Sequence, residues 1–112
     1  MTLALFAPTP RGRQLAHWLG SLLNEELICW SKADSQGDPL PPPWQAYGDP
    51  AQPSTPGSLS EAVAQTWPKV QGCLFFLATG SVIRLIAPLL QDKHSDPAVV
   101  VVDESGRWVI SL

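Results

Sequence analysis

Four short apolar runs without polar alternation constrain the fold of this chain more than any other feature. The runs cover residues 3–7, 27–30, 72–78 and 98–102. Uninterrupted runs of this length are typical of strands that are buried on both faces, as in parallel sheets. Parallel neighbours need a long crossover between them, and that crossover is usually a helix. The pattern therefore favours an α/β fold.

A helical pattern lies between the first two runs. Leucines recur at helical spacing over residues 14–23, and Thr9 with Pro10 forms an N-cap followed by a proline at the first helical position. Strand, helix and strand within about 30 residues predict a βαβ unit with a right-handed crossover.

Two more helices are predicted before the last apolar run. The first runs from Ser58 to about residue 67, because Ser58 and Glu61 stand at capping-box spacing. The second covers residues 82–90, where Pro88 should kink or shorten it.

The end of the chain predicts a β-hairpin. Residues 103–106 (Asp-Glu-Ser-Gly) form a turn with a glycine at its left-handed position. Residues 107–112 then alternate, with Trp108, Ile110 and Leu112 on one face. The expected fold is a three-layer α/β/α arrangement around a five-stranded, mainly parallel sheet, whose antiparallel strand comes from this C-terminal hairpin.

A proline-rich segment covers residues 31–57. Seven of the 12 prolines fall between Pro39 and Pro56. Proline has no N–H to donate, so we expect a long surface loop that sustains neither helix nor sheet ladder. Trp44 and Tyr47 are the side chains expected to pin this loop to the domain. A variable insertion is favoured over a proline-rich ligand site.

Composition excludes several classes of protein. With 112 residues, 45% of them hydrophobic, the chain suits one domain, 1–112, without disorder. Ten acidic against seven basic residues argue against a nucleic-acid binder. Two cysteines exclude a disulfide scaffold and indicate the cytoplasm. No apolar run reaches the roughly 18 residues of a membrane-spanning helix, so no membrane partner is expected.

The junction after the third apolar run is a candidate anion site. Thr79, Gly80 and Ser81 form a tight turn between a buried strand and a helix whose first amides are free. Arg84, in the first turn of the predicted helix, could add a planar fork for a carboxylate or phosphate. The alternative is that Gly80 only shapes the turn and that Arg84 is solvated.

A polar loop at residues 91–97 is the second candidate. His94 could act as a general base, although a surface histidine in a polar loop is the simpler interpretation. Asp96, before a proline, is typical of a turn into the next strand. The sequence does not fix which edge of the sheet carries this loop. No spacing of ligands predicts a metal site.

The segment from Gly80 to Leu112 resembles the amino-terminal domain of the CbiG family. It reads GSVIRLIAPLLQDKHSDPAVVVVDESGRWVISL. These proteins are cobalamin-biosynthesis enzymes, the cobalt-precorrin 5A hydrolases, which open the ring A δ-lactone of a cobalt-corrinoid and release acetaldehyde. The family pattern continues with Gly-His-x-Gly-Gly-Ala-Asn and a further domain. The resemblance therefore implies that this chain is part of a longer, possibly fused, hydrolase.

The resemblance also implies a substrate and roles for the candidate residues. Corrinoid intermediates carry many acetate and propionate arms, so the 79–81 turn with Arg84 would hold one carboxylate and Lys93 another. Candidates for activating water are Asp92, His94 and Asp96. No cofactor is implied, since the substrate itself carries the cobalt. The implied partners are the C-terminal CbiG region or a fused or associated precorrin methyltransferase.

Two other functions stay open. One is a non-catalytic module that binds the corrinoid or a partner enzyme. The other is a general phosphate-ligand α/β domain. An acetaldehyde assay separates the first from a hydrolase, and titration with nucleotides tests the second.

Overall fold

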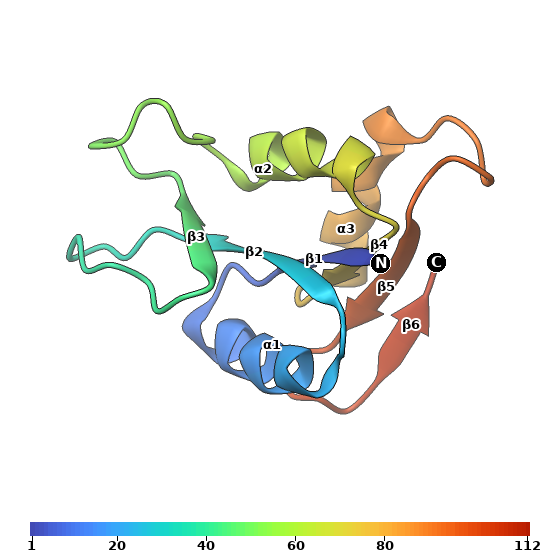
Figure 1. Cartoon of the computed structure of the whole chain (residues 1–112), viewed down its shortest axis with the longest axis horizontal. Helices are drawn as coiled ribbons and strands as arrows, with labels where there is room; N and C mark the ends of the chain where they lie inside the picture. Colours follow the sequence, from blue (N-terminus) through green and yellow to red (C-terminus); the bar gives the residue numbers. More distant parts are fainter.

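One six-stranded sheet forms the middle layer of the computed structural model, which describes residues 1–112 (Figure 1). Its strand order is β3-β2-β1-β4-β5-β6. The first five strands in this order are mutually parallel, and only the β5–β6 pair is antiparallel. The strand bounds are β1 Thr2–Phe6, β2 Glu26–Lys32, β3 Trp44–Tyr47, β4 Gly72–Phe75, β5 Ala98–Val102 and β6 Val109–Ser111.

Helices cover both faces of the sheet. One face carries α1 (Pro10–Leu22), and the other carries α2 (Leu59–Thr66) and α3 (Thr79–Ile86) (Figure 1). Short 3-10 turns, η1 (Trp67–Lys69) and η2 (Ala87–Leu89), follow α2 and α3. The predicted three-layer α/β/α architecture is confirmed. No helix combines the length and the apolar character needed to cross a membrane.

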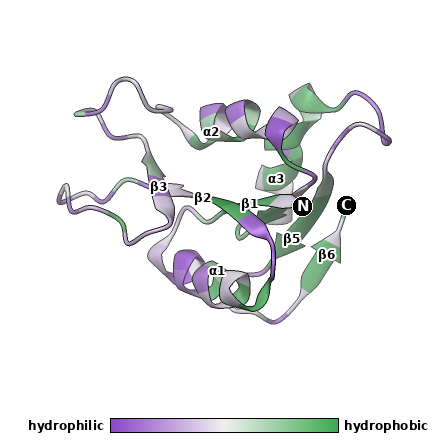
Figure 2. Ribbon diagram, in the orientation of Figure 1, coloured by the Kyte–Doolittle hydropathy of each residue, from purple (hydrophilic) through white to green (hydrophobic).

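The sheet separates two hydrophobic cores, and the apolar colouring of Figure 2 is clearest along β5 and β6. Alternate side chains of each strand point to opposite faces, so neighbouring residues enter different cores. Phe6 and Phe75 stack at a centroid distance of 4.9 Å in the core under α2 and α3, whereas Leu5 and Phe76 belong to the core on the α1 face. The buried indole N–H of Trp30 donates to Thr66 Oγ1 at 3.0 Å and so ties β2 to α2.

Local capping begins two helices where the sequence predicts. Thr9 Oγ1 accepts from the Gly12 amide, with Pro10 as the first residue of α1. Ser58 Oγ accepts from the Glu61 amide at the start of α2. The Glu61 carboxylate accepts from the Gly57 amide and not from that of Ser58, so half of the predicted capping box is present.

The predicted strand number is wrong, because the proline-rich segment contributes the sixth strand. β3 pairs with β2 in the register Cys29↔Trp44 to Lys32↔Tyr47. The four residues of β3 contain no proline, so each keeps the N–H that a ladder needs. Pro43 directly precedes β3, and Pro50 follows it after two residues. Trp44 and Tyr47 are both buried, as the sequence predicts.

The junction after β4 also differs from its prediction. β4 ends at Phe75, and α3 begins at Thr79, so residues 79–81 are the first turn of a helix and not a separate tight turn. Pro88 shortens α3 as expected, since the helix ends at Ile86. The terminal hairpin is confirmed, with Gly106 at φ +77°.

The two cysteines are buried and unbonded. They do not lie on neighbouring strands, because β1 separates Cys29 on β2 from Cys73 on β4. Their side chains belong to different cores.

Candidate functional site

The strand order reverses between β1 and β4. From β1 the chain proceeds outward through β2 to β3, and from β4 it proceeds the other way to β5 and β6. The connections that leave β1 and β4 therefore enter helices on opposite faces, α1 and α3 (Figure 1). In open α/β sheets, ligands bind in the crevice that such a reversal creates at the carboxyl ends of the strands.

The α1 side of this reversal is closely packed. A Cβ atom on Gly12 would lie 3.3 Å from the Phe76 carbonyl oxygen and 3.1 Å from Thr9 Oγ1. The absence of a side chain thus lets the start of α1 approach the end of β4. Arg13 extends from the same turn, where its Nη1 lies 3.5 Å from Ser31 Oγ. Ser31 in turn donates to the Ala7 carbonyl at 2.6 Å.

The α3 side carries free backbone donors. Thr9 and Ser58 cap α1 and α2 with their side chains, whereas Ala78, the N-cap of α3, has no side chain that can do so. The first intrahelical bond of α3 runs from the Val82 amide to the Ala78 carbonyl. The amides of residues 79–81 therefore point out of the helix, where the positive end of its dipole lies.

A cavity of about 400 Å³ opens beside this helix start, between the ends of β4 and β5. Thr79, Trp108 and two carboxylates, Asp103 and Glu104, are among its lining residues. The hydrogen bond from Ser105 and the charge of Arg107, 3.6 Å away, hold the pKa of Asp103 below its usual range. Glu104 has no such partner. Of the three residues with free amides, Thr79 thus shares this cavity with the two negative side chains.

Arg84 lies in the last turn of α3 and not in the first, because the helix starts three residues earlier than predicted. It is exposed and forms no ion pair. Residues four apart share a helix face, so Arg84 lies on the same exposed face as Gly80. Helical side chains lean toward the helix N-terminus in general, and Arg84 is not among the residues that line the cavity.

The polar loop lies at the opposite edge of the sheet, just before β5. Asp96 Oδ2 accepts from the amides of Gln91 and Asp92, at 2.9 and 3.1 Å. Asp92 Oδ1 accepts from the His94 amide at 3.1 Å. Both carboxylates therefore order the loop backbone. The side chains of Lys93 and His94 are exposed and make no such contact.

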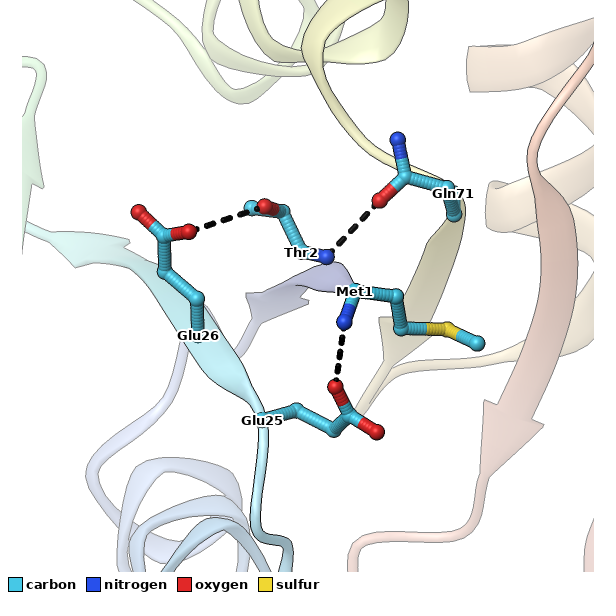
Figure 3. A network of polar contacts seen from close by, with 5 residues as sticks. All are labelled: Met1, Thr2, Glu25, Glu26 and Gln71. Carbon is cyan, nitrogen blue, oxygen red and sulfur yellow. Dashed lines mark hydrogen bonds and ion pairs between the residues drawn. The ribbon is translucent and has the colours of Figure 1, made fainter.

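A second network of polar contacts connects the starts of β1, β2 and β4 at the same amino edge (Figure 3). The Met1 ammonium lies 2.6 Å from a Glu25 carboxylate oxygen, and the Gln71 side-chain oxygen accepts from the Thr2 amide at 2.7 Å. Thr2 also donates to Glu26 at 3.2 Å. The structure therefore divides the predicted residues: Thr79, Gly80 and Ser81 lie at the carboxyl edge, and the loop with Lys93 lies at the amino edge.

Sequence reasoning missed the residues on the α1 side of the reversal. Thr9, Arg11 and Arg13 open α1 directly after a buried strand, which is the same strand-to-helix pattern that identified residues 79–81. The signal was present, but Thr9 and Pro10 were interpreted only as helix-starting residues. The described chain contains no group of three His, Cys, Asp or Glu side chains placed to hold a metal ion.

Comparisons with known proteins agree on one family. Residues 61–112 match the family model described as cobalamin synthesis G N-terminal. A cobalt-precorrin-5A hydrolase of Salmonella typhimurium (strain LT2) is 35% identical over 111 residues, which are 99% of this chain and 28% of that protein. A cobalt-precorrin-5A hydrolase of Priestia megaterium is 30% identical over 109 residues, 97% of this chain and 27% of that protein.

One solved structure shares the fold. It is a crystal structure described as a cobalamin biosynthesis protein G homologue from Sulfolobus solfataricus, with a TM-score of 0.63 and 14% sequence identity. The match covers 99% of this chain and 28% of that one. The chain thus spans little more than a quarter of the length of each of these relatives.

Proposed function

The chain belongs to the cobalamin synthesis G N-terminal family, and from this premise we propose that it is the corrinoid-binding domain of a cobalt-precorrin-5A hydrolase. The observation that carries the proposal is the match to two curated hydrolases, at 30% identity or more, over at least 97% of the chain. The complete hydrolase would open the ring A lactone of its substrate and release acetaldehyde. The substrate brings its own cobalt, and no further cofactor is proposed.

The proposed contact at the carboxyl edge is to a carboxylate arm of the substrate. The free amides of residues 79–81 would donate to the carboxylate oxygens, and Arg84 would approach from the same helix face. The uncapped start of α3 supports this contact, because each of the other two α-helices has a side chain that satisfies one of its first amides. Thr79 and Ser81 would add hydroxyl donors.

Glu104 opposes an anion in this cavity, whereas Arg107 partly neutralises Asp103. Glu104→Gln removes one negative charge at nearly constant volume. We expect it to tighten corrinoid binding by about two- to fivefold at low salt, with a smaller gain at high salt. Isothermal titration of wild-type and variant chains at two ionic strengths measures this difference. Weaker binding by the variant would show that Glu104 is a ligand contact.

The amino-edge loop is proposed as a second contact. Lys93 would hold another arm of the substrate, and Asp92, His94 and Asp96 are the candidates for activating water. Asp92 and Asp96 already accept amide hydrogen bonds, so His94 has the more available side chain. His94→Asn in the complete hydrolase should lower acetaldehyde release and leave corrinoid binding unchanged if this assignment is right.

A non-catalytic binding module is the second candidate function. The relatives named as hydrolases are proteins of which this chain matches little more than a quarter. The C-terminal region of such a hydrolase, or an associated precorrin methyltransferase, would then be its partner. No nucleic-acid or membrane partner is proposed. We also propose a cytoplasmic location, which the two unbonded cysteines support.

The test incubates the 112-residue chain with cobalt-precorrin 5A and measures both corrinoid binding and acetaldehyde. Binding with acetaldehyde supports the hydrolase, binding alone supports the module, and the absence of both overturns the proposal. Arg84→Ala should weaken binding by about tenfold, as expected for a charged hydrogen bond. Lys69→Ala, which removes an exposed cation from η1, is the matched control and should leave binding unchanged.

A further inference from the structure

Exposed apolar side chains gather along the α3 face of β6. Nine large hydrophobic residues of the chain are at least 38% exposed. Six of them lie on α3, on the segment after it, or on β6 and its flanks: Ile83, Leu90, Trp108, Val109, Ile110 and Leu112. Val109 is opposite Val102 of the α1-face core, so the other five belong to the α3 face. A contiguous apolar surface of this kind usually marks an interaction site.

The pairing of β5 with β6 sets the direction of the β6 side chains. Ile110 is opposite Val101, whose side chain belongs to the core under α2 and α3. Paired residues of antiparallel strands project to the same face, and residues two apart on one strand do so too. Trp108, Ile110 and Leu112 therefore form one row on the α3 face.

A stripe of α3 faces this row. Thr79 lines the cavity of about 400 Å³ together with Trp108. Ile86 and Leu90 line a second cavity, of about 700 Å³, together with Leu112. Ile83 is four residues after Thr79 and three before Ile86, so it lies on the same helix face. The surface between α3 and β6 thus has a cavity at each end, with the exposed side chains of Ile83 and Ile110 between them. We call this surface the groove.

The groove is a position where a further layer of structure would fit. Val99 and Val101 of β5 line its two ends, and no helix lies over β6 in Figure 1. A sheet face with an apolar row is stable when another element covers it. An amphipathic helix suits a groove between a helix and a strand, with apolar residues at i, i+3 or i+4, and i+7. Asp103 and Glu104 at one end would favour its positive amino terminus.

We propose that this groove binds a helix from the remaining part of a cobalt-precorrin-5A hydrolase, a proposal that rests on the proposed function. More than two-thirds of each relative lies outside its match to this chain. In those proteins a domain of this kind therefore shares a polypeptide with additional structure. Leu112, directly after β6, lines the amino-edge end of the groove.

The test uses the Salmonella typhimurium hydrolase without the segment that matches this chain. This remainder is titrated calorimetrically into the 112-residue chain, without corrinoid. We expect a saturable complex that Ile83→Asp and Ile110→Asp each weaken by about tenfold or more, as for central apolar contacts of an interface. Leu22→Asp is the matched control, because Leu22 is 63% exposed on α1, on the other face of the sheet. It should change the affinity less than about twofold.

Two results would overturn the proposal: no complex with the wild-type chain, or an equal loss with Leu22→Asp. A groove-dependent dimer of the 112-residue chain that excludes the remainder, detected by sedimentation, would also do so, because a second copy would then be the occupant. Thermal unfolding of each variant verifies folding, and Ile83→Asp preserves the test if Ile110→Asp is unfolded. Corrinoid binding is measured separately. Failure of the groove to bind the remainder can therefore be distinguished from failure of the chain to bind the corrinoid.

Discussion

The two edge strands of the sheet, β3 and β6, differ in how deeply their side chains are buried. At one edge, β3 buries Trp44 and Tyr47, each only 6% exposed, and prolines precede and follow it. At the other edge, all three residues of β6 are exposed and proline is absent from residues 98–112. Because proline has no N–H to donate, the flanking prolines limit how far a ladder could extend along β3. The β3 edge is thus short and packed onto the domain, a closed edge, whereas the exposed β6 edge is an open one that a partner can reach.

The largest expected contrast between the edges concerns their tryptophans. Trp44→Ala should lower the free energy of unfolding by about 3–5 kcal/mol, because it removes a buried indole from the α1-face core. Trp108→Ala removes a half-exposed indole and its contact with Arg107, and should cost about 1 kcal/mol or less. Urea unfolding measures both. Equal losses of unfolding free energy in the two variants would contradict the distinction between a closed β3 edge and an open β6 edge.

Cys29 reports whether the β3 edge stays closed. Its residue pairs with Trp44 in the ladder, and burial raises the pKa of its thiol from 9.0 to about 11. At pH 8 this shift alone lowers the thiolate fraction by about 100-fold, and thiolate is the reactive form. In a Cys73→Ser variant, Cys29 is the only thiol. Its reaction with a disulfide reagent should therefore be at least about 100-fold slower in the folded protein than in the protein unfolded by urea. Fast native labelling would mean that the β3 edge opens readily.

His17 anchors the closed edge from α1. The indole N–H of Trp44 donates to His17 Nδ1 at 3.3 Å. His17→Leu leaves this N–H without its acceptor and should destabilise the fold by about 1 kcal/mol. Gln14→Leu, one turn earlier on α1, is the control and should have no comparable effect. A Trp44 indole resonance that is unchanged in His17→Leu would contradict the assigned hydrogen bond.

The smallest expected effect is a pH-dependent change in stability beside the open β6 edge, at Asp103. Bonding to Ser105 and Arg107 lowers the pKa of Asp103 in the folded state. Its contribution to stability is therefore present above the unfolded pKa of about 4 and is lost as the pH falls through the folded pKa. Asp103→Asn should remove this part of the acid destabilisation and leave the β3 edge unchanged. Thermal unfolding between pH 7 and pH 3 measures the difference, and identical pH profiles would contradict it.

The candidate site was predicted only in part. Free amides at residues 79–81 follow from a buried strand that runs into a helix, which is a local pattern. The position of Arg84 was missed because the start of a helix is a local detail that tertiary packing shifts by a few residues. Neither Glu104, in the cavity beside Thr79, nor Arg13, at the start of α1, was predicted, since both come from distant parts of the chain.

The sequence by itself determined the layers of this protein. Apolar runs such as residues 72–78 and 98–102, separated by helical spacing, permit little other than a parallel sheet with helices on both faces. Tertiary structure alone decided the strand order, the pairing of β3 within the proline-rich segment, and the opposite placement of Thr79 and Lys93. The physical reason is range: periodicity and capping act within one or two turns of chain, whereas strand pairing joins residues that no local pattern connects.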